Sequence, residues 1–249
     1  MQTTIPTPAK ALSILMKYDF TTQWRNRRSV ILVLLVPIII LISWQGAIDK
    51  IGPTFVLSMC ISVGLTAIGL MGYANALARD RDKGVFQRLR VAPVPTWTIM
   101  VSRLAVQLAM ILLLTTIVFV MAFKQNNITL STNGYVLTFL AAMVGGALYL
   151  GLGQMIAGLL KNAETVNSTS RLVYFVFIMV GMFGDTGLLG EKVKQTVQWS
   201  PYGTVKTILS ASMKPETWNQ HATTALVVTL IYAVIFSFLG IKLFKWNVK

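Results

Sequence analysis

The chain has 249 residues, of which 55% are hydrophobic and only 12% are charged, and its mean hydropathy is +0.66. A soluble globular domain has roughly 25% charged residues, so this composition excludes an ordinary soluble domain and indicates a membrane protein. The formal net charge of +14 does not require a nucleic-acid partner, because the basic residues are distributed as a membrane orientation signal (below). The single cysteine, Cys60, and the single histidine, His221, provide neither an intrachain disulfide nor a metal site.

The N-terminal segment, residues 1–28, is predicted to contain an amphipathic helix over Ala9–Arg28. Its apolar residues recur every four positions and alternate with lysines and arginines: Leu12, Met16, Phe20 and Trp24. This pattern is typical of a helix that lies in the membrane interface, with its cations near anionic lipid headgroups. The alternative is a solvated leader whose periodicity arises by chance.

The remainder of the chain, 29–249, is predicted to be an all-α domain with six transmembrane helices. About 20 apolar residues are needed to cross the hydrocarbon core, and several runs reach that length. We expect spans at about 29–48, 54–78, 99–123, 135–160, 172–189 and 222–244. The first apolar run begins near Ser29, which is later than expected for a cleavable secretory signal.

Two spans have unusual features. The fourth contains small residues four positions apart, including Gly153 and Ala157, which predicts close approach of a neighbouring helix. We predict a polar loop over 161–171, so the fifth span is apolar only over Leu172–Gly184, which is too short by itself for a full crossing. Either the helix ends early at Asp185 at the outer surface, or the chain breaks and re-enters there. The glycines of 184–190 favour the break, followed by short re-entrant helices in the outer leaflet over Glu191–Glu216.

The basic residues predict the orientation in the membrane. Six spans place both termini on one side, and that side holds 16 of the 22 lysines and arginines, against 6 on the other. The positive-inside rule makes the first side cytoplasmic. We therefore expect a multi-pass protein of the cell membrane, of bacterial type, with both termini in the cytoplasm.

The loop after the second span is the most highly charged part of the chain. Residues 79–90 contain seven charges in twelve positions. Val85, Phe86 and Leu89 would share one face of a short helix within this loop. The pattern predicts a cytoplasmic helix on which a partner protein docks, whereas the simplest alternative is a solvated loop.

The sequence has few residues that could perform chemistry. A Gly-x-x-x-x-Gly-Lys-Ser/Thr phosphate loop, a Gly-x-Ser-x-Gly elbow and a His-Glu-x-x-His zinc motif are all missing from it. None of the eight acidic residues is expected near mid-membrane, which argues against ion- or proton-coupled transport. Movement of a substrate would then need energy from another protein.

The charged loop resembles the acidic–basic–Gly–x–x–Glu–Arg–Leu–x–x–x–Pro motif of ABC-2 type permeases, the membrane subunits of ABC exporters with the type V, G-subfamily-like fold. The matching residues are Asp80 to Leu89 followed by Pro93, and the likeness in layout covers nearly the whole chain. Ser200-Pro201-Tyr202 also resembles an element that precedes the last helix in that family. Gln87 departs from the family pattern, which has Glu there, and Asp80 and Asp82 stand where Glu is frequent.

The resemblance implies a coupling helix that receives force from a separate ATP-binding subunit, with ATP and Mg bound by that partner and no cofactor in this chain. Two such subunits would pair with two permease subunits, identical or homologous. The implied coupling residues, with Phe86 and Leu89 inserted into the ATPase and Gly84 at a turn, are Arg79, Asp80, Arg81, Asp82, Gly84, Val85, Phe86, Gln87, Arg88 and Leu89. The implied substrate path runs along spans two and five, through Ser62, Thr66, Asn75, Phe175, Phe177, Met179 and Met182.

The leading hypothesis is therefore an exporter permease for a hydrophobic or amphipathic compound such as a drug, antibiotic or lipid, as in multidrug efflux. One alternative is an ATP-independent carrier or channel, which would need an essential membrane-embedded charge. Another is a membrane immunity or sensor protein that binds a ligand without transporting it. Neither the substrate nor a homodimeric or heterodimeric state follows from the sequence.

Overall fold

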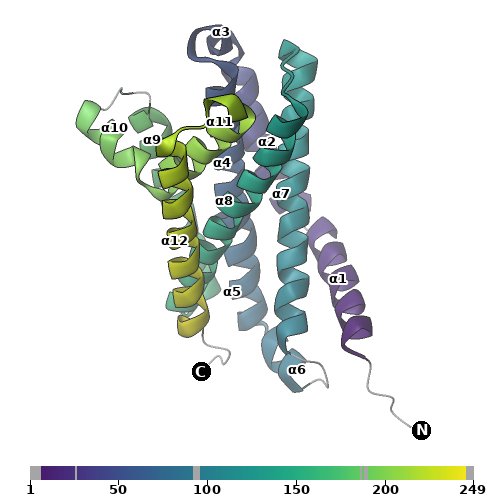
Figure 1. The fold of residues 1–249 in the computed structure, drawn as a ribbon. Helices are drawn as coiled ribbons and strands as arrows, with labels where there is room; N and C mark the ends of the chain where they lie inside the picture. The colour runs from purple at the N-terminus through teal and green to yellow at the C-terminus, as the bar shows by residue number, and fades with distance from the viewer. Residues whose placement is uncertain (1–6, 26, 92–95, 186, 188–189, 245–249) are drawn as a thin grey trace.

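A computed structural model describes residues 7–25, 27–91, 96–185, 187 and 190–244, and every regular element among them is helical (Figure 1). The N-terminal helices are α1 Pro8–Arg25, α2 Arg27–Ser43, the 3-10 turn η1 Gln45–Ala47 and α3 Ile48–Ile51. The central helices are α4 Pro53–Ala67, the π-helix η2 Ile68–Ala74, α5 Asn75–Asp82, α6 Val85–Val91, α7 Thr96–Asn126 and α8 Thr132–Leu159. The C-terminal helices are α9 Ala163–Asp185, α10 Glu191–Gln198, α11 Pro201–Met213, the 3-10 turn η3 Pro215–Thr217 and α12 Gln220–Leu243.

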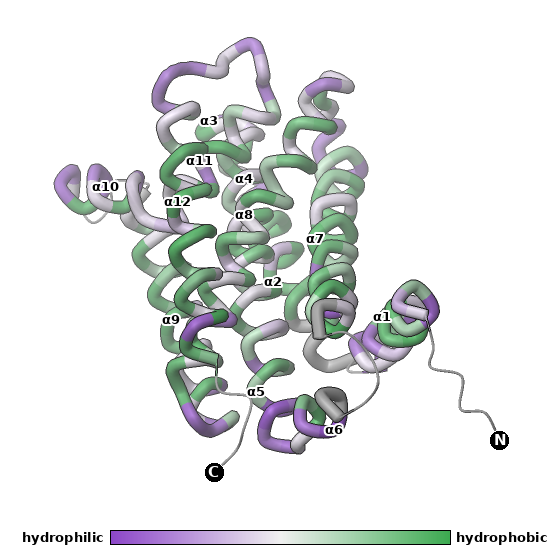
Figure 2. The backbone as a smooth tube through the Cα atoms, turned by 60° about the horizontal axis from the view of Figure 1, so that its bottom comes forward, coloured by the Kyte–Doolittle hydropathy of each residue, from purple (hydrophilic) through white to green (hydrophobic). Residues whose placement is uncertain are grey.

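Five helices of the described chain are long and apolar enough to cross a membrane: 53–82, 98–126, 132–159, 163–184 and 220–243. A sixth crossing results if Val33–Ser43 and Gln45–Ile51, which meet at 47°, are one bent span. Figure 2 shows the corresponding apolar middle of α7, α8 and α12, with hydrophilic residues concentrated at α6 and α10. The expected all-helical membrane fold is confirmed, with five to six candidate spans.

The helix α8 is central to the bundle, because its small residues allow close approach of helices on several sides. A Cβ atom on Gly153 would overlap the backbone carbonyl of Gly69 in η2, and one on Gly151 would collide with α12 at Ser237. The close packing expected from the small residues of this helix is thus present. It keeps the π-helical segment and α12 in fixed positions against α8.

The fifth candidate span differs from the sequence expectation at its start. Residues 163–171 are helical, so the connection between α8 and α9 is confined to Leu160–Asn162 and the predicted polar loop over 161–171 is wrong. The side chain of Asn162 caps the new helix by accepting a hydrogen bond from the Thr165 amide. With these residues, α9 has 23 residues rather than 13. The predicted break over 184–190 falls partly outside the described residues.

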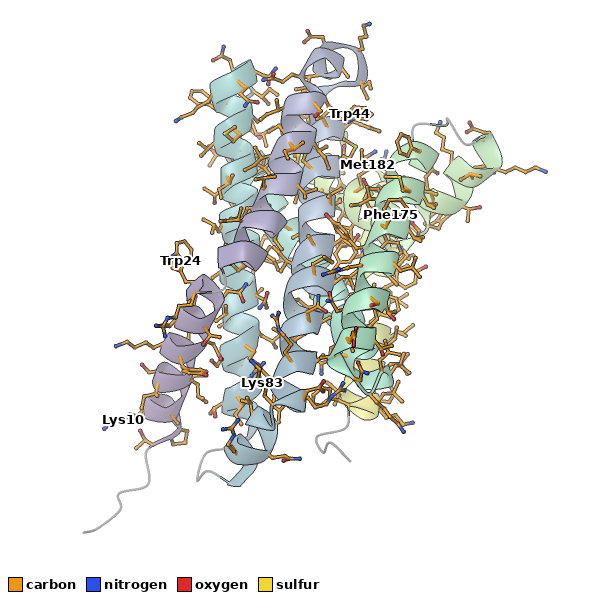
Figure 3. All side chains as sticks on the ribbon, turned by 180° about the vertical axis from the view of Figure 1, so that it is seen from behind. Lys10, Trp24, Trp44, Lys83, Phe175 and Met182 are labelled. Carbon is orange, nitrogen blue, oxygen red and sulfur yellow. The ribbon has the colours of Figure 1, made fainter. Side chains whose placement is uncertain are left out.

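The helix α1 lies along α7 at the end of the bundle that also carries α6 (Figure 1). The four apolar residues predicted to recur along this helix do not share one environment. Leu12 and Met16 are partly buried, whereas Phe20 and Trp24 are exposed. A spacing of four residues advances 400° around a helix, so the stripe drifts by about 40° at each step. Figure 3 shows Trp24 and Lys10 near opposite ends of this helix. Arg27 and Arg28 belong to α2, so α1 is shorter than the predicted Ala9–Arg28.

The segment before α12 forms two short helices, α10 and α11. Ser200 caps α11 by accepting a hydrogen bond from the Gly203 amide at 3.1 Å, and Pro201 occupies the first helical position. Tyr202 is buried against Gly181 of α9. The Ser-Pro-Tyr element therefore starts α11 and packs it against α9.

Candidate functional site

The charged segment singled out by the sequence forms the end of α5, a tight turn and α6. Gly84 has a φ of +66°, in the left-handed region that glycine adopts without steric cost, and this lets the chain reverse between the two helices. The turn lies at the same end of the bundle as α1 and the C-terminal end of α12 (Figure 1). Pro93, the last residue of the family motif, lies outside the described residues.

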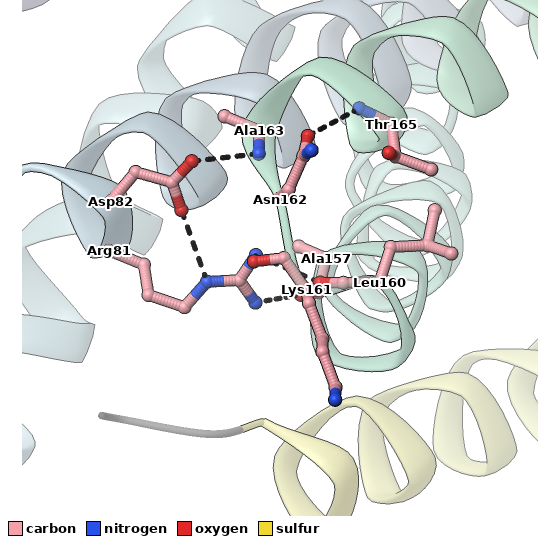
Figure 4. Close-up of polar contacts among 8 residues, drawn as sticks. All are labelled: Arg81, Asp82, Ala157, Leu160, Lys161, Asn162, Ala163 and Thr165. Carbon is pink, nitrogen blue, oxygen red and sulfur yellow. Dashed lines mark hydrogen bonds and ion pairs between the residues drawn. The ribbon is translucent and has the colours of Figure 1, made fainter. Parts of the chain in front are cut away.

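Arg81 is a buried residue that joins several elements at this end of the molecule, with only 4% of its surface exposed. Its guanidinium donates hydrogen bonds to the carbonyl of Ala157 and, at 2.8 and 2.9 Å, to those of Leu160 and Lys161 (Figure 4). These carbonyls belong to the last turn of α8 and the residues after it, where backbone acceptors have no partner within the helix. Arg81 therefore caps α8 from the end of α5.

The neighbouring Asp82 makes the equivalent contact with the next helix. Its carboxylate accepts a hydrogen bond from the Ala163 amide at 2.8 Å, at the start of α9, and lies 3.7 Å from Nε of Arg81 (Figure 4). A carboxylate is favourable at a helix N-terminus because the first amides carry partial positive charge. Two consecutive residues of α5 thus hold the C-terminal end of α8 and the N-terminal end of α9.

A second set of contacts joins α5 and α6 to α7. Asp80 forms an ion pair with Arg103 at 2.7 Å, and the Arg103 guanidinium lies 4.7 Å from the centre of the Phe86 ring. Phe86 also makes an edge-to-face contact with Phe244, at 5.5 Å between ring centres. Through these contacts, α6 is attached to α7 and to the C-terminal end of α12.

Phe86 differs from the sequence expectation. Only 1% of its surface is exposed, so its side chain is part of this chain's own core and does not extend toward a partner. The neighbouring Gln87 and Arg88 are exposed, as are Arg79, Asp82 and Lys83, whereas Val85 is partly buried. Leu89 lies in α6, but its side chain is outside the described part. The outward surface of the segment is therefore polar and charged.

The ionic cluster extends to α1 through a contact that the sequence analysis missed. Ser102 of α7 donates a hydrogen bond to the carboxylate of Asp19, close to Arg103 and Asp80. Burial raises the pKa of Asp19 above its usual value of 3.8, against the opposing effects of the Ser102 hydrogen bond and the Arg103 charge. Asp19 and Ser102 are 83 positions apart, and no local pattern connects them.

The predicted substrate-path residues divide between the interior and the surface. Ser62, Thr66 and Asn75 are buried, and the Ser62 hydroxyl and the Asn75 carbonyl oxygen have no hydrogen-bond partner in the described chain. Asn75 directly follows η2, and its side-chain amide donates a hydrogen bond to the Met71 carbonyl at 3.0 Å. Because π-helical segments are frequent at functional sites, this position is a candidate for function.

The residues expected on α9 face different directions. Met182 is buried with Met59, Val63 and Tyr202 of the interior, and the partly buried Phe177 lies 6.4 Å from the Tyr149 ring. Phe175 is 58% exposed, and Met179 is partly buried. Figure 3 shows Phe175 and Met182 at different heights on the same helix. The structure thus does not bring all seven predicted residues onto one surface.

The described residues contain no cluster of three or more His, Cys, Asp or Glu side chains with metal-binding geometry. The acids at the α6 end are instead used in contacts between helices, with Arg103, Ser102 and the Ala163 amide as partners. This arrangement can hold helix ends together and move them as one unit.

Comparison with known proteins agrees with this architecture. The family model of the ABC-2 type transporter matches residues 10–202, a range that begins in α1 and ends at Tyr202, in the first turn of α11. The chain is also similar to YvfS of Bacillus subtilis (strain 168), a protein provisionally named as a transport permease. The two are 22% identical over 185 residues, which cover 71% of this chain and 75% of that protein. The chain therefore belongs to the ABC-2 type transporter family and is a membrane component of transport rather than a catalytic subunit.

Proposed function

We propose that this chain is the permease subunit of an ABC exporter, driven by ATP that a separate ATP-binding subunit hydrolyses. The observation that carries this proposal is the network at the end of α5, where Arg81 and Asp82 hold α8 and α9 while Asp80 holds α7 through Arg103. A push on α6 is therefore delivered to three further helices at once. Force transmission needs such direct contacts, because a solvated loop would bend without moving the spans.

The partner would contact the polar outer surface of α5 and α6. Lys83, Gln87 and Arg88 are exposed there, and Arg88 donates to the Lys83 carbonyl at 2.8 Å, which fixes the turn. Because Phe86 lies inside the chain, we replace the initial hypothesis of an inserted aromatic residue by a polar and ionic contact. ATP and Mg would be held by the partner, present in two copies.

The orientation follows from the positive-inside rule applied to the helix bounds. The end that carries α6 also carries the basic residues of α1 and the last turn of α12, so we place it in the cytoplasm. The end that carries α3 and η3 would then face outward, and α10 and α11 would be re-entrant helices of the outer leaflet. The cell membrane of a bacterium is the expected location.

A second permease subunit, identical or homologous, would pair with this one along α9. Only 22% of the apolar window of this helix is buried, and its exposed residues are large and apolar: Leu172, Phe175, Val176, Val180 and Phe183. Exposed apolar residues are equally compatible with lipid, so the choice of α9 rests on the family resemblance. The substrate would pass near α9 and the second span, where the buried Ser62 of α4 and Asn75 of α5 supply polar groups among apolar ones.

The test is reconstitution of the chain in sealed vesicles, with and without an ATP-binding subunit from the same cell. The proposal predicts that the two proteins purify together and that ATP drives outward movement of an amphipathic dye. The double variant Asp80→Asn with Arg103→Gln should lower transport while ATP hydrolysis continues, because α5 is released from α7. Transport that proceeds at an unchanged rate without any ATPase would contradict the proposal.

A further inference from the structure

A cavity of about 340 Å³ is lined by residues of α4, α11, η3 and α12. The helix α11 and the start of α12 lie at the end of the bundle opposite α6 (Figure 1). The cavity is formed where the start of α4, the second half of α11, η3 and the start of α12 meet. Its lining residues are Thr54, Lys206, Thr207, Ser210, Ala211, Lys214, Thr217, Asn219, His221 and Ala222. Small-molecule sites have volumes of roughly 300–1,000 Å³, so this cavity is large enough for a small polar group.

The lining of this cavity is basic. Lys206, Lys214 and His221 contribute to it, and none of the lining residues is an aspartate or glutamate. The acid nearest in the chain, Glu216, is exposed and is not part of the lining. Hydroxyl groups of Thr207 and Ser210 complete a donor-rich surface, a combination that is typical of sites for phosphate and carboxylate groups.

Lys206 is held deep in this site. Only 7% of its surface is exposed, and its Nζ lies 3.2 Å from the centre of the Phe55 ring, which stabilises the ammonium through a cation–π contact. Burial nevertheless lowers the pKa of Lys206 to about 7. An anion in the cavity would compensate the burial of this charge and favour the protonated amine.

The two helix ends at the cavity carry opposite partial charges. The N-terminal end of α12 carries partial positive charge, and Asn219 caps it by accepting a hydrogen bond from the Ala222 amide at 2.9 Å. The C-terminal carbonyls of α11 carry partial negative charge, and the backbone amide of Lys214 donates a hydrogen bond to one of them, that of Ala211. These two partial charges oppose each other, so the formal charge of the lining, which contains two lysines and no acid, remains positive.

We propose that this cavity binds a phosphate-bearing anionic group, with Lys206 and Lys214 as its cationic contacts and the hydroxyls of Thr207 and Ser210 as further donors. Two sources share this chemistry: the headgroup of an anionic phospholipid, and a soluble phosphate compound. On the proposed orientation, the site faces the outer leaflet. The inference uses the proposed function only for that assignment, and its test contains no ATPase.

The experiment uses the full chain in nanodiscs made of phosphatidylcholine, with and without phosphatidylglycerol. Native mass spectrometry counts the lipids that remain bound after release, and in a separate arm inorganic phosphate is titrated while the melting temperature is recorded. Retention of one phosphatidylglycerol assigns a lipid headgroup. A saturable rise of the melting temperature with phosphate alone assigns a soluble anion.

Three variants make the result specific to the cavity. Lys206→Met and Lys214→Gln should each lower the retained or bound fraction by about tenfold, as expected for the loss of one charge-assisted hydrogen bond. Lys50→Gln is the matched control, since Lys50 is an exposed lysine of α3 at the same end but outside the cavity, and it should change binding by less than about twofold.

Lys214 is exposed, so its replacement tests the site even if the variant at Lys206 does not fold. The proposal is overturned if neither anion binds saturably, or if Lys50→Gln lowers binding as much as Lys214→Gln does. The second outcome would show attraction to the surface charge of this end rather than a site.

Discussion

The two ends of the molecule use charged residues in opposite ways. At the α6 end, Asp80 and Asp82 of α5 contact α7 and α9, Arg81 contacts the end of α8, and Asp19 joins α1 to α7, so these residues connect five helices. At the other end, Lys206, Lys214 and His221 surround a cavity whose lining contains no acid. The first arrangement holds helices to one another, whereas the second is suited to a ligand that arrives from outside. Charge at the α6 end joins helices, whereas the basic cavity at the other end is the proposed anion site.

The largest effect is expected at the α6 end, from Arg81→Met. This change removes the donors for three carbonyl groups near the end of α8, and should lower the free energy of unfolding by about 2–4 kcal/mol. The matched control is Arg88→Met, because Arg88 is exposed and donates its hydrogen bond to the Lys83 carbonyl within the same turn rather than to another span. Thermal unfolding in detergent measures both. Equal melting temperatures for the two variants would show that Arg81 does not hold α8.

The ion pair between Asp80 and Arg103 should have a smaller effect on stability. A double-mutant cycle with Asp80→Asn and Arg103→Gln should give a coupling energy of about 1 kcal/mol, because the pair is partly exposed and short. The cycle uses the same thermal measurement. A coupling energy near zero would mean that α5 and α7 are held by packing alone.

At the opposite end, replacing a buried basic residue by methionine should leave the fold intact. Lys206→Met should alter the free energy of unfolding by less than about 1 kcal/mol in the absence of anions, because methionine replaces a buried charge with an apolar side chain of similar volume. Comparison with Arg81→Met tests the contrast between the ends directly. A destabilisation by Lys206→Met as large as that by Arg81→Met would show that charged residues at both ends contribute equally to stability.

Anion binding at this end should depend on pH. Since burial lowers the pKa of Lys206 to about 7, the amine is protonated below that value, and binding of phosphatidylglycerol, whose phosphodiester keeps one negative charge, should weaken as the pH rises from 6 to 8. His221 and Lys214 face the same cavity, so the measurement is made with His221→Gln, in which the imidazole cannot contribute. Binding that is unchanged over this range would show that Lys206 stays charged throughout.

The smallest effect is expected for Asp19. A raised pKa means that the folded state favours the neutral carboxyl, so this group's contribution to stability is fully present below pH 3.8 and is lost as the pH rises through the raised pKa. Asp19→Asn should make the melting temperature less dependent on pH above 4 than it is in the unchanged protein. Asp49→Asn, at an exposed acid in α3, is the control and should leave the dependence as it was.

The features that the sequence predicted well are those with a local physical cause. Run length and hydropathy predicted an all-helical membrane protein, and five to six candidate spans are present among the described residues. The start of α9 was missed because 163–171 is polar, although Asn162 and Glu164 carry the signals of a helix N-terminus.

The features that were missed depend on distant segments. Periodicity placed Val85, Phe86 and Leu89 on one helix face, but it could not indicate that Phe244 and Arg103 of the same chain cover Phe86. The carbonyls bound by Arg81 are 76 to 80 positions away, and the residues of the basic cavity come from four separate elements. Such contacts arise only when the helices pack.

The central claim is that the exposed surface of α6 receives force from an ATP-binding subunit, and photo-crosslinking from that helix tests it most directly. A photoreactive amino acid at Gln87, which is exposed, should form a covalent adduct with an ATP-binding protein in intact cells. The same probe at Lys192, an exposed position in α10, which the proposed orientation places outside the cytoplasm, should form none. Absence of that adduct at Gln87 from a correctly inserted protein, or an equal adduct from Lys192, would contradict the claim.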